Sequence, residues 1–300
     1  RTHIVALTQK MKHDIRQSNY LIQLTSNNNC CNKNNKINFY NKQWLVLYYN
    51  SYTKVYNILK KCMKRSAFNN TWYDIDQTLT DQLDNSTIHF IQSTYNRIVH
   101  LPSLPSVHNN DDRSMIVSPR GVLLSTSINQ SIINRYQMYE KKFIKSGGIV
   151  IIDDLLTKQT LYNIRKYLNE AFIYHDPRMG YIGAYGQSGV LMDPSIVMLV
   201  SALGHLFPNV LCGLPLVQIW AYKYDQSYNK FHQTNVTHSG IALHADDAQV
   251  NMNIWLTKSR TDNMKETTGG LLIYPNLKSS NNDLFSKFNQ SPPTGGFLLK

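Results

Sequence analysis

The apolar residues of this chain change their spacing at the glycine pair Gly147–Gly148. Before the pair, they recur every three or four positions, which predicts an amphipathic helix over 44–59; they are Trp44, Leu45, Tyr48, Tyr49, Tyr52, Val55, Tyr56 and Leu59. After the pair, apolar residues come in short runs separated by polar turns, which is typical of strands. The pattern indicates an α+β protein with a mainly β core, preceded by a helical region.

Two further helices are predicted within the helical region, which we place at residues 41–145. One lies around 74–99 and ends before Pro102, because proline stops a helix. The other spans 128–145 and is closed by the two glycines. The polar residues 101–120 between them predict a linker.

Residues 1–40 are rich in Asn and lack a sustained period, so we expect them to be poorly ordered. Residues 1–65 carry twelve Lys or Arg against the single acid Asp14, a balance of +11 within a total of +12. A basic N-terminal arm of this kind suits nucleic acid or another anionic surface. The alternative, which we favour, is that Lys rises with Asn in a biased segment such as "NNNCCNKNNKIN".

From residue 146 to residue 300, strands and turns predict a separate domain. The run "GIVIIDDLL" at 148–156 predicts a strand, and the helix after it has Thr157 as its N-cap. Further strands are predicted at "PLVQIWAYKYD", "VNMNIWLT" and "GGLLIYP". Repeated short strands favour a sandwich or barrel over a doubly wound sheet.

The segment "GIALHADDAQV" contains an H-x-D pair, His244 and Asp246, directly before a predicted strand. Residues two apart in a strand lie on the same face, so this imidazole and this carboxylate can reach one metal ion. They would supply two of the three ligands that non-haem Fe(II) oxygenases use. Because an H-x-D pair arises readily by chance, its neighbours must carry the argument.

The neighbouring strands add polar side chains suited to a cavity. Tyr222 and Tyr224 share one face of the strand before the pair. Asn251 and Asn253 share one face of the strand after it. The segments around the pair therefore indicate a sheet with one polar face.

The runs "GGIVIIDDLL", "MGYIGAYGQSG", "QIWAYKYD", "HADDAQVNMNIWLT" and "TGGLLIYP", in this order, resemble the iron- and 2-oxoglutarate-dependent dioxygenases, in particular the prolyl-hydroxylase-like branch. The resemblance covers about residues 146–276. It implies a double-stranded β-helix, a cupin-like jelly roll with flanking helices. It also implies a hydroxylase that oxidises a C–H bond while 2-oxoglutarate is decarboxylated to succinate.

The same resemblance implies the site residues. His244 and Asp246 would bind the iron, and Tyr224 and Tyr222 would neighbour the 2-oxoglutarate. Asn253 would contact the cofactor from the following strand. The implied cofactors are Fe(II) and 2-oxoglutarate, with ascorbate as an accessory reductant.

Members of that family place a second His ligand after the G-G strand, and then an Arg or Lys for the far carboxylate of 2-oxoglutarate. No His follows His244 in this sequence, and we interpret the abrupt "GGFLLK" end as a chain cut short before that ligand, inactive on its own. The alternative is a non-catalytic jelly roll that serves as a binding module. A zinc site of His232, His238 and His244 is a weaker alternative, because two of them lie in a polar loop.

The composition limits the expected location and partners of the protein. No run of 18 or more apolar residues exists to span a bilayer, so we expect no membrane partner. The four Cys form neither a C-x-x-C pair nor a dense disulfide framework, which favours a reducing, cytoplasmic location inside the cell. The substrate, whether a protein or a small molecule, is not determined by a fold of this kind.

Overall fold

The computed structural model describes residues 2–27, 42–65, 72–73, 75–102, 130–146, 148–178, 181–224, 246 and 248–257. The chain forms two compact units. Unit 1 comprises Arg1–Asp111, Tyr162–Val197 and Gln218–Asp225, and unit 2 comprises Asp112–Leu161, Met198–Val217 and Gln226–Lys300. Each unit therefore contains residues from both sides of position 146, where the sequence predicted a domain boundary.

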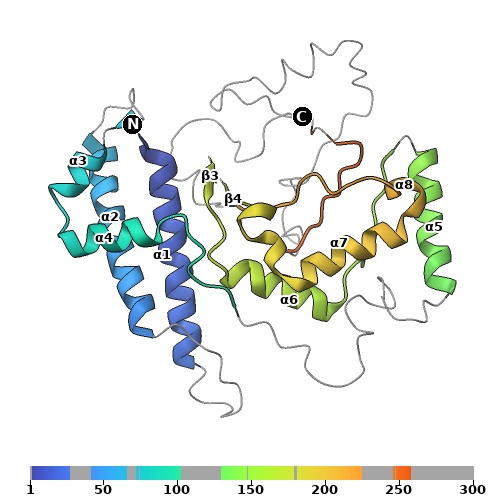
Figure 1. Ribbon diagram of the computed structural model, residues 1–300, viewed down its shortest axis with the longest axis horizontal. Coiled ribbons are helices and arrows are strands. Elements are labelled where there is room, and N and C mark those ends of the chain that lie inside the picture. Colours follow the sequence, from blue (N-terminus) through green and yellow to red (C-terminus); the bar gives the residue numbers. More distant parts are fainter. Residues whose placement is uncertain are drawn as a thin grey trace, which may run out of the picture. The chain divides into compact units, whose positions relative to one another are not determined.

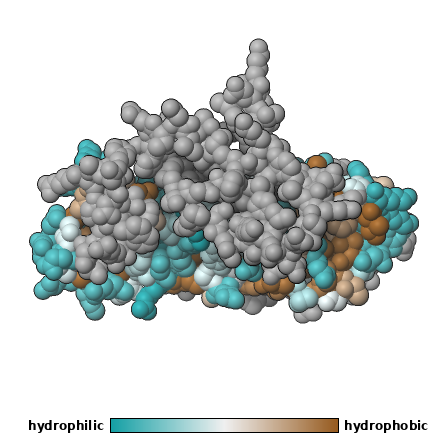
Figure 2. Space-filling view, turned by 90° about the horizontal axis from the view of Figure 1, so that it is seen from above, coloured by the Kyte–Doolittle hydropathy of each residue, from teal (hydrophilic) through white to brown (hydrophobic). Residues whose placement is uncertain are grey.

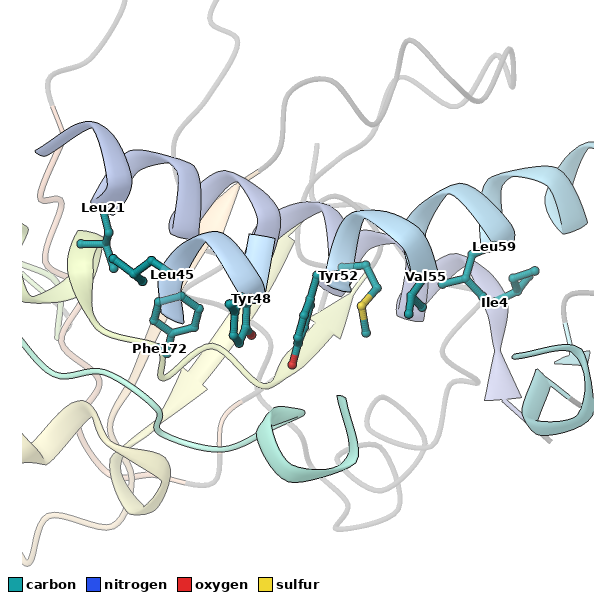
Figure 3. Close-up of a cluster of buried hydrophobic side chains, with 9 residues drawn as sticks. Ile4, Leu21, Leu45, Tyr48, Tyr52, Val55, Leu59 and Phe172 are labelled. Atoms are coloured by element: carbon teal, nitrogen blue, oxygen red, sulfur yellow. The ribbon is translucent and has the colours of Figure 1, made fainter. Parts of the chain in front are cut away.

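Unit 1 is built on a pair of long helices, α1 (Ile4–Asn27) and α2 (Lys42–Arg65), which lie side by side (Figure 1). They run antiparallel, since Leu21 lies beside Leu45 and Ile4 beside Leu59 (Figure 3). The buried side chains between them form one hydrophobic cluster, which includes Met11, Tyr48, Tyr52, Val55 and Phe172. The helix predicted over 44–59 is confirmed within α2, and Leu45, Tyr48, Tyr52, Val55 and Leu59 of the predicted stripe are buried.

The helix α1 differs from the prediction for residues 1–40. We expected little order there, but Ile4, Met11 and Leu21 are buried against α2. The polar residues between them include Gln9, Lys10, Asp14, Gln17 and Ser18, which are also buried. The hydrophobic period of α1 is weak because part of its buried face is polar, which explains why the sequence did not predict it. Residues 28–41 lie outside the described ranges.

Short elements complete the helical side of unit 1. The strands β1 (Thr2–His3) and β2 (Trp72–Tyr73) pair antiparallel. The predicted helix over 74–99 is divided into α3 (Ile75–Thr80) and α4 (Asn85–Thr94). The division falls at Asp84, whose carboxylate caps α4 by accepting a 2.7 Å hydrogen bond from the Thr87 amide.

The helix α6 (Lys158–Glu170) begins as predicted, because the Thr157 hydroxyl accepts a 2.7 Å hydrogen bond from the Thr160 amide. The prediction of a strand at 148–156 is wrong, because this segment does not form a strand in the structure. Ile151 is exposed, and Asp154 has a positive φ of 54°, which interrupts an extended chain. An apolar run of this length needs a neighbouring strand, and the segment has none among the described residues.

An antiparallel sheet of three strands, β3 (Asp176–Arg178), β4 (Tyr181–Tyr185) and β5 (Trp220–Tyr224), lies in unit 1. The strand predicted at 215–225 is confirmed over β5. Short 3₁₀ turns, η2 (Gly186–Ser188) and η3 (Val190–Met192), follow β4.

Unit 2 contains α5 (Gln130–Lys145) and α8 (Pro208–Leu211), and α7 (Pro194–Leu206) crosses the boundary between the units. The helix predicted over 128–145 is confirmed, and Gly148, with a φ of +90°, closes it by donating to the Phe143 carbonyl at 2.9 Å. The Tyr136 ring meets the Phe207 ring edge-on at 5.6 Å. Figure 2 shows hydrophobic side chains among hydrophilic ones on the described part of the face that it presents.

The double-stranded β-helix stays a prediction. The described strands form a three-stranded sheet, and residues 225–245 and 258–300, where further strands were predicted, lie outside the described ranges. Residues 250–257 are described, but they are not paired as a strand within the described part of the chain.

Candidate functional site

The two faces of the three-stranded sheet differ in chemistry. Residues paired across an antiparallel sheet point to the same side, and successive residues alternate. The register Arg178↔Tyr181↔Tyr224 and the register Asp176↔Gly183↔Tyr222 therefore put these residues on one face, which we call the tyrosine face. The opposite face carries Pro177, Ile182, Ala184, Ala221 and Lys223 and packs toward α1.

Aromatic rings lie close together on the tyrosine face. The Tyr181 ring meets the Tyr222 ring edge-on at 5.1 Å and lies 5.8 Å from the Tyr224 ring. Gly183 leaves room for Tyr222, because a Cβ at this glycine would lie 3.2 Å from the Cε1 atom of the ring. Burial raises the pKa of the Tyr222 hydroxyl, so it remains protonated and able to donate a hydrogen bond at neutral pH.

A charged group borders these rings. Arg178 Nε donates to both oxygens of the Asp176 carboxylate, at 3.0 and 2.9 Å, and the Tyr185 hydroxyl donates to the same carboxylate. The hydrogen bond to Asp176 raises the pKa of Arg178 further, so the guanidinium keeps its charge. The tyrosine face thus offers phenol donors beside the ion pair of Arg178 and Asp176.

The opposite face of the sheet contains a buried amine. Lys223 Nζ donates to Gln17 Oε1 at 3.3 Å and lies 4.2 Å from the centre of the Tyr174 ring. A cavity of about 400 Å³ opens beside it within unit 1. Its lining comes from one face of α1, from Asn169 and from the sheet: Gln9, His13, Arg16, Gln17, Tyr20, Asn169, Ile182, Lys223 and Tyr224.

Burial lowers the pKa of Lys223 to about 7, although the Asp14 carboxylate opposes that change. An amine with this pKa is about half uncharged at neutral pH. Two further hydrogen bonds hold Gln17 in place for its contact with Lys223, since its Nε2 donates to the Asn169 and Ala171 carbonyls at 2.9 and 2.8 Å. The environment of Lys223 is therefore fixed by buried partners.

An ion pair lies beside this cavity, inside α1. Lys10 Nζ donates to the buried Asp14 carboxylate, which also accepts a 3.2 Å bond from the Tyr48 hydroxyl. Burial alone would raise the pKa of Asp14, but Lys10 and His13 outweigh it and hold that pKa below its ordinary value. Asp14 is therefore ionised, and its negative charge is matched by Lys10.

His13 contacts Asp14 of this ion pair and also lines the cavity. Its Nδ1 lies 3.0 Å from Asp14 Oδ1, which assigns the ring proton to Nδ1, because a carboxylate only accepts. Burial lowers the pKa of His13 to about 4, so the ring is neutral at pH 7. Its Nε2 is then a buried acceptor with no partner in the described part of the protein.

The residues implied as metal ligands are described in part. His244 lies outside the described ranges, as do His232 and His238 of the zinc alternative. The Asp246 carboxylate is partly exposed and accepts a 3.0 Å hydrogen bond from Asn251 Nδ2. Asn253 is exposed. Where side chains are described, no three His, Cys, Asp or Glu converge on one point as a metal site.

The structure brings together some of these residues. Tyr222 and Tyr224 share the tyrosine face, as their spacing predicted. They belong to unit 1, and Asp246 and Asn253 belong to unit 2. The two tyrosines are therefore described within unit 1, and Asp246 and Asn253 within unit 2.

The cavity beside Lys223 was not foreseen. The only sequence signal for it was the spacing of Gln9, His13 and Gln17, which places three polar side chains on one helical face. That signal was overlooked because the segment was not predicted to be a helix.

Comparisons of the chain with protein-family models, with curated proteins and with solved structures find no match. Among the described helices, none combines the length and the apolar character that crossing a membrane requires.

Proposed function

We propose that this chain belongs to an Fe(II)- and 2-oxoglutarate-dependent hydroxylase, with His244 and Asp246 as two protein ligands of the iron. The observation that carries the proposal is the order of motifs: a strand with Tyr222 and Tyr224 precedes the H-x-D pair, and a G-G run follows it. The two tyrosines lie on one face of β5, and their hydroxyl groups would act as donors to a carboxylate.

The donor set suits the metal. A neutral imidazole and a carboxylate are the ligand types that non-haem Fe(II) sites use, and the Asp246 carboxylate is partly exposed and so accessible. When bound, the iron and 2-oxoglutarate would supply the oxidising power for attack on a C–H bond. His244 and Asp246 would hold the metal, while Asn251 would orient the carboxylate through its 3.0 Å hydrogen bond.

The tyrosine face would bind the co-substrate. The hydroxyl groups of Tyr222 and Tyr224 are donors at neutral pH, because burial raises the pKa of both. Donors of this kind would hold a carboxylate of 2-oxoglutarate and orient it. A reducing, cytoplasmic location, which keeps iron ferrous, is part of the same proposal, and the thiols of Cys62 and Cys212 are free.

Metal binding tests the proposal directly. Fe(II) is titrated under anaerobic conditions with 2-oxoglutarate present, and the charge-transfer absorbance of the ternary complex is followed. We expect saturable binding of one Fe(II) per chain, at least about tenfold weaker in His244→Ala and in Asp246→Ala. Asp153→Ala, which removes an exposed carboxylate elsewhere in unit 2, is the matched control and should bind Fe(II) like the wild type.

Turnover is the second readout. Protein expressed from the whole reading frame should release succinate from 2-oxoglutarate, and both ligand variants should abolish this activity. Equal Fe(II) affinity in the wild type and in Asp246→Ala, or undiminished succinate release in either variant, would show that the assignment is wrong.

A non-catalytic binding module is the second candidate. It would keep the jelly roll as a binding surface without the metal chemistry. It predicts no Fe(II) saturation and no succinate release, even from the whole reading frame. The nucleic-acid hypothesis is not favoured: part of the basic segment is folded into α1 and α2, and Lys10 is buried in an ion pair.

A further inference from the structure

The cavity beside Lys223 shares one lining residue, Tyr224, with the tyrosine face, and the proposed iron site uses none of its other lining residues. Its nine lining residues all belong to unit 1, whereas His244 and Asp246 belong to unit 2. At about 400 Å³ it is large enough for a small metabolite. Lining residues of α1 recur at three-and-four spacing from Gln9 to Tyr20, so the cavity is bounded by one helical face.

Lys223 is the chemically reactive group of this cavity. Its Nζ is enclosed by Gln17 and by the Tyr174 ring, and Tyr174 is only 2% exposed. Among the described residues it forms no ion pair with a carboxylate, because the nearest acid, Asp14, is bonded to Lys10. A desolvated amine without a counter-ion is a good nucleophile for carbonyl carbon at neutral pH.

Two residues of the lining each contain a buried acceptor atom without a partner in the part of the chain that is described. The atoms are Gln9 Oε1 and His13 Nε2. Gln9 is 8% exposed, and its amide is fixed because Nε2 donates to the Tyr181 carbonyl at 2.9 Å. Both atoms lie beneath the surface of the lining, which is therefore polar below its surface.

The rim of the cavity is cationic. Arg16 and Tyr20 are exposed lining residues one turn apart on α1. An exposed guanidinium beside a phenol attracts a carboxylate or phosphate. The lining thus combines an amine, Lys223, with a cation at the mouth, Arg16.

We propose that this cavity binds a small anionic aldehyde or ketone and that Lys223 condenses with its carbonyl group to form an imine. The Nζ lone pair forms the C–N bond, and the carbonyl π electrons move to oxygen, which takes up a proton. The hydroxyl group formed in this way is then lost as water. The nitrogen gives up one proton in each of the two steps, and the imine remains. The reaction consumes no oxidant, reductant or metal, so it is independent of the iron site.

Reductive trapping tests the proposal on the whole chain. Glyoxylate and cyanoborohydride are added at pH 7, and each lysine is quantified by peptide mass spectrometry. We expect Lys223 to be labelled at least about tenfold faster than the exposed Lys142 of α5, because its uncharged fraction is far larger. Labelling of Lys223 no faster than Lys142 in native protein would overturn the proposal, and this readout needs no variant.

Two variants separate the parts of the argument. Lys223→Arg keeps the positive charge and removes the nucleophile, so the fast-labelled peptide should disappear while other lysines keep their rates. Arg16→Gln should slow labelling of Lys223 by glyoxylate several-fold and leave labelling by neutral propionaldehyde unchanged. An equal change with both aldehydes would contradict the anionic class of ligand.

Discussion

The Tyr48 hydroxyl on α2 donates a 3.2 Å hydrogen bond to the Asp14 carboxylate on α1, which joins the two helices through a buried charge. Asp14 also accepts from Lys10, and both residues are almost fully buried. Replacing Asp14 by Asn would leave the Lys10 ammonium in a buried site without its counter-charge. We expect Asp14→Asn to lower the free energy of unfolding by about 3–5 kcal/mol, measured by urea denaturation.

A double variant provides the control. Lys10→Met combined with Asp14→Leu removes both charges, so most of the loss should be recovered, because no uncompensated charge remains. The exposed pair between Lys54 and Asp84 offers a comparison, and Lys54→Met should cost less than about 1 kcal/mol. A double variant as unstable as Asp14→Asn would contradict this account.

Gly189 and Gly204 form a matched pair for a second prediction. Gly189 has a φ of +128°, and a Cβ added there would collide with the Ile173 side chain. We expect Gly189→Ala to destabilise the protein by about 2–4 kcal/mol, from backbone strain and overpacking together. Gly204 lies within α7 with open space around it, so Gly204→Ala should raise stability by about 0.5–1 kcal/mol. Thermal unfolding of both variants checks the two signs.

Glu140 supports a third prediction, in unit 2. This buried side chain of α5 accepts hydrogen bonds from the Asn209 and Val210 amides, at 2.9 and 3.1 Å, and from Asn209 Nδ2 at 2.7 Å. Glu140→Ala would leave three donors without an acceptor, so the expected loss is about 2–4 kcal/mol of unfolding free energy. Glu140→Gln retains one acceptor oxygen and should lose less in the same denaturant titration. Equal losses would mean that the hydrogen bonds are not the cause.

The fourth prediction concerns pH. Burial lowers the pKa of His100 to about 4, against about 6.5 in an unfolded chain. Between these values the unfolded state binds a proton that the folded state does not, so stability is complete above pH 6.5 and falls as the pH decreases toward 4. The contribution is on the order of 3 kcal/mol for a side chain this buried. His13 and His175, with pKa values lowered to about 4 as well, act in the same direction.

A variant isolates the share of His100. In His100→Gln the unfolding free energy should depend less steeply on pH between 4 and 6.5 than in the wild type, because one of the titrating groups is absent. Denaturant titrations at several pH values measure this slope. An unchanged slope would show that His100 is protonated equally in both states.

The elements that the sequence predicted are those whose buried face is apolar. Trp44 to Leu59 repeat with a helical period, and α2 buries that stripe. Thr157 is a local signal, since a cap depends only on the next three residues. The alternation of β5 placed Tyr222 and Tyr224 on one face for the same reason: side-chain direction in a strand is a local property.

The elements that the sequence did not predict, or predicted wrongly, depend on contacts with residues far away in the sequence. The polar side chains of α1 are buried because Asp14 meets Tyr48 and Gln17 meets Lys223, and neither partner is visible from the local pattern. The run at 148–156 has strand-like composition, but a strand also needs a hydrogen-bonded neighbour. The cavity beside Lys223 joins residues more than two hundred positions apart, so no local reading of the chain predicts it.

Unit 1 is assembled from three separate segments of the chain, which has a consequence for folding during synthesis on the ribosome. The helix α1 is made first, yet the strand that carries Lys223 is made about two hundred residues later. At roughly 5–20 residues per second, the buried polar face of α1 waits about 10–40 s for that partner. During this interval Gln17 lacks Lys223, and the polar face of the nascent helix stays exposed to water while its apolar face can already pack on α2.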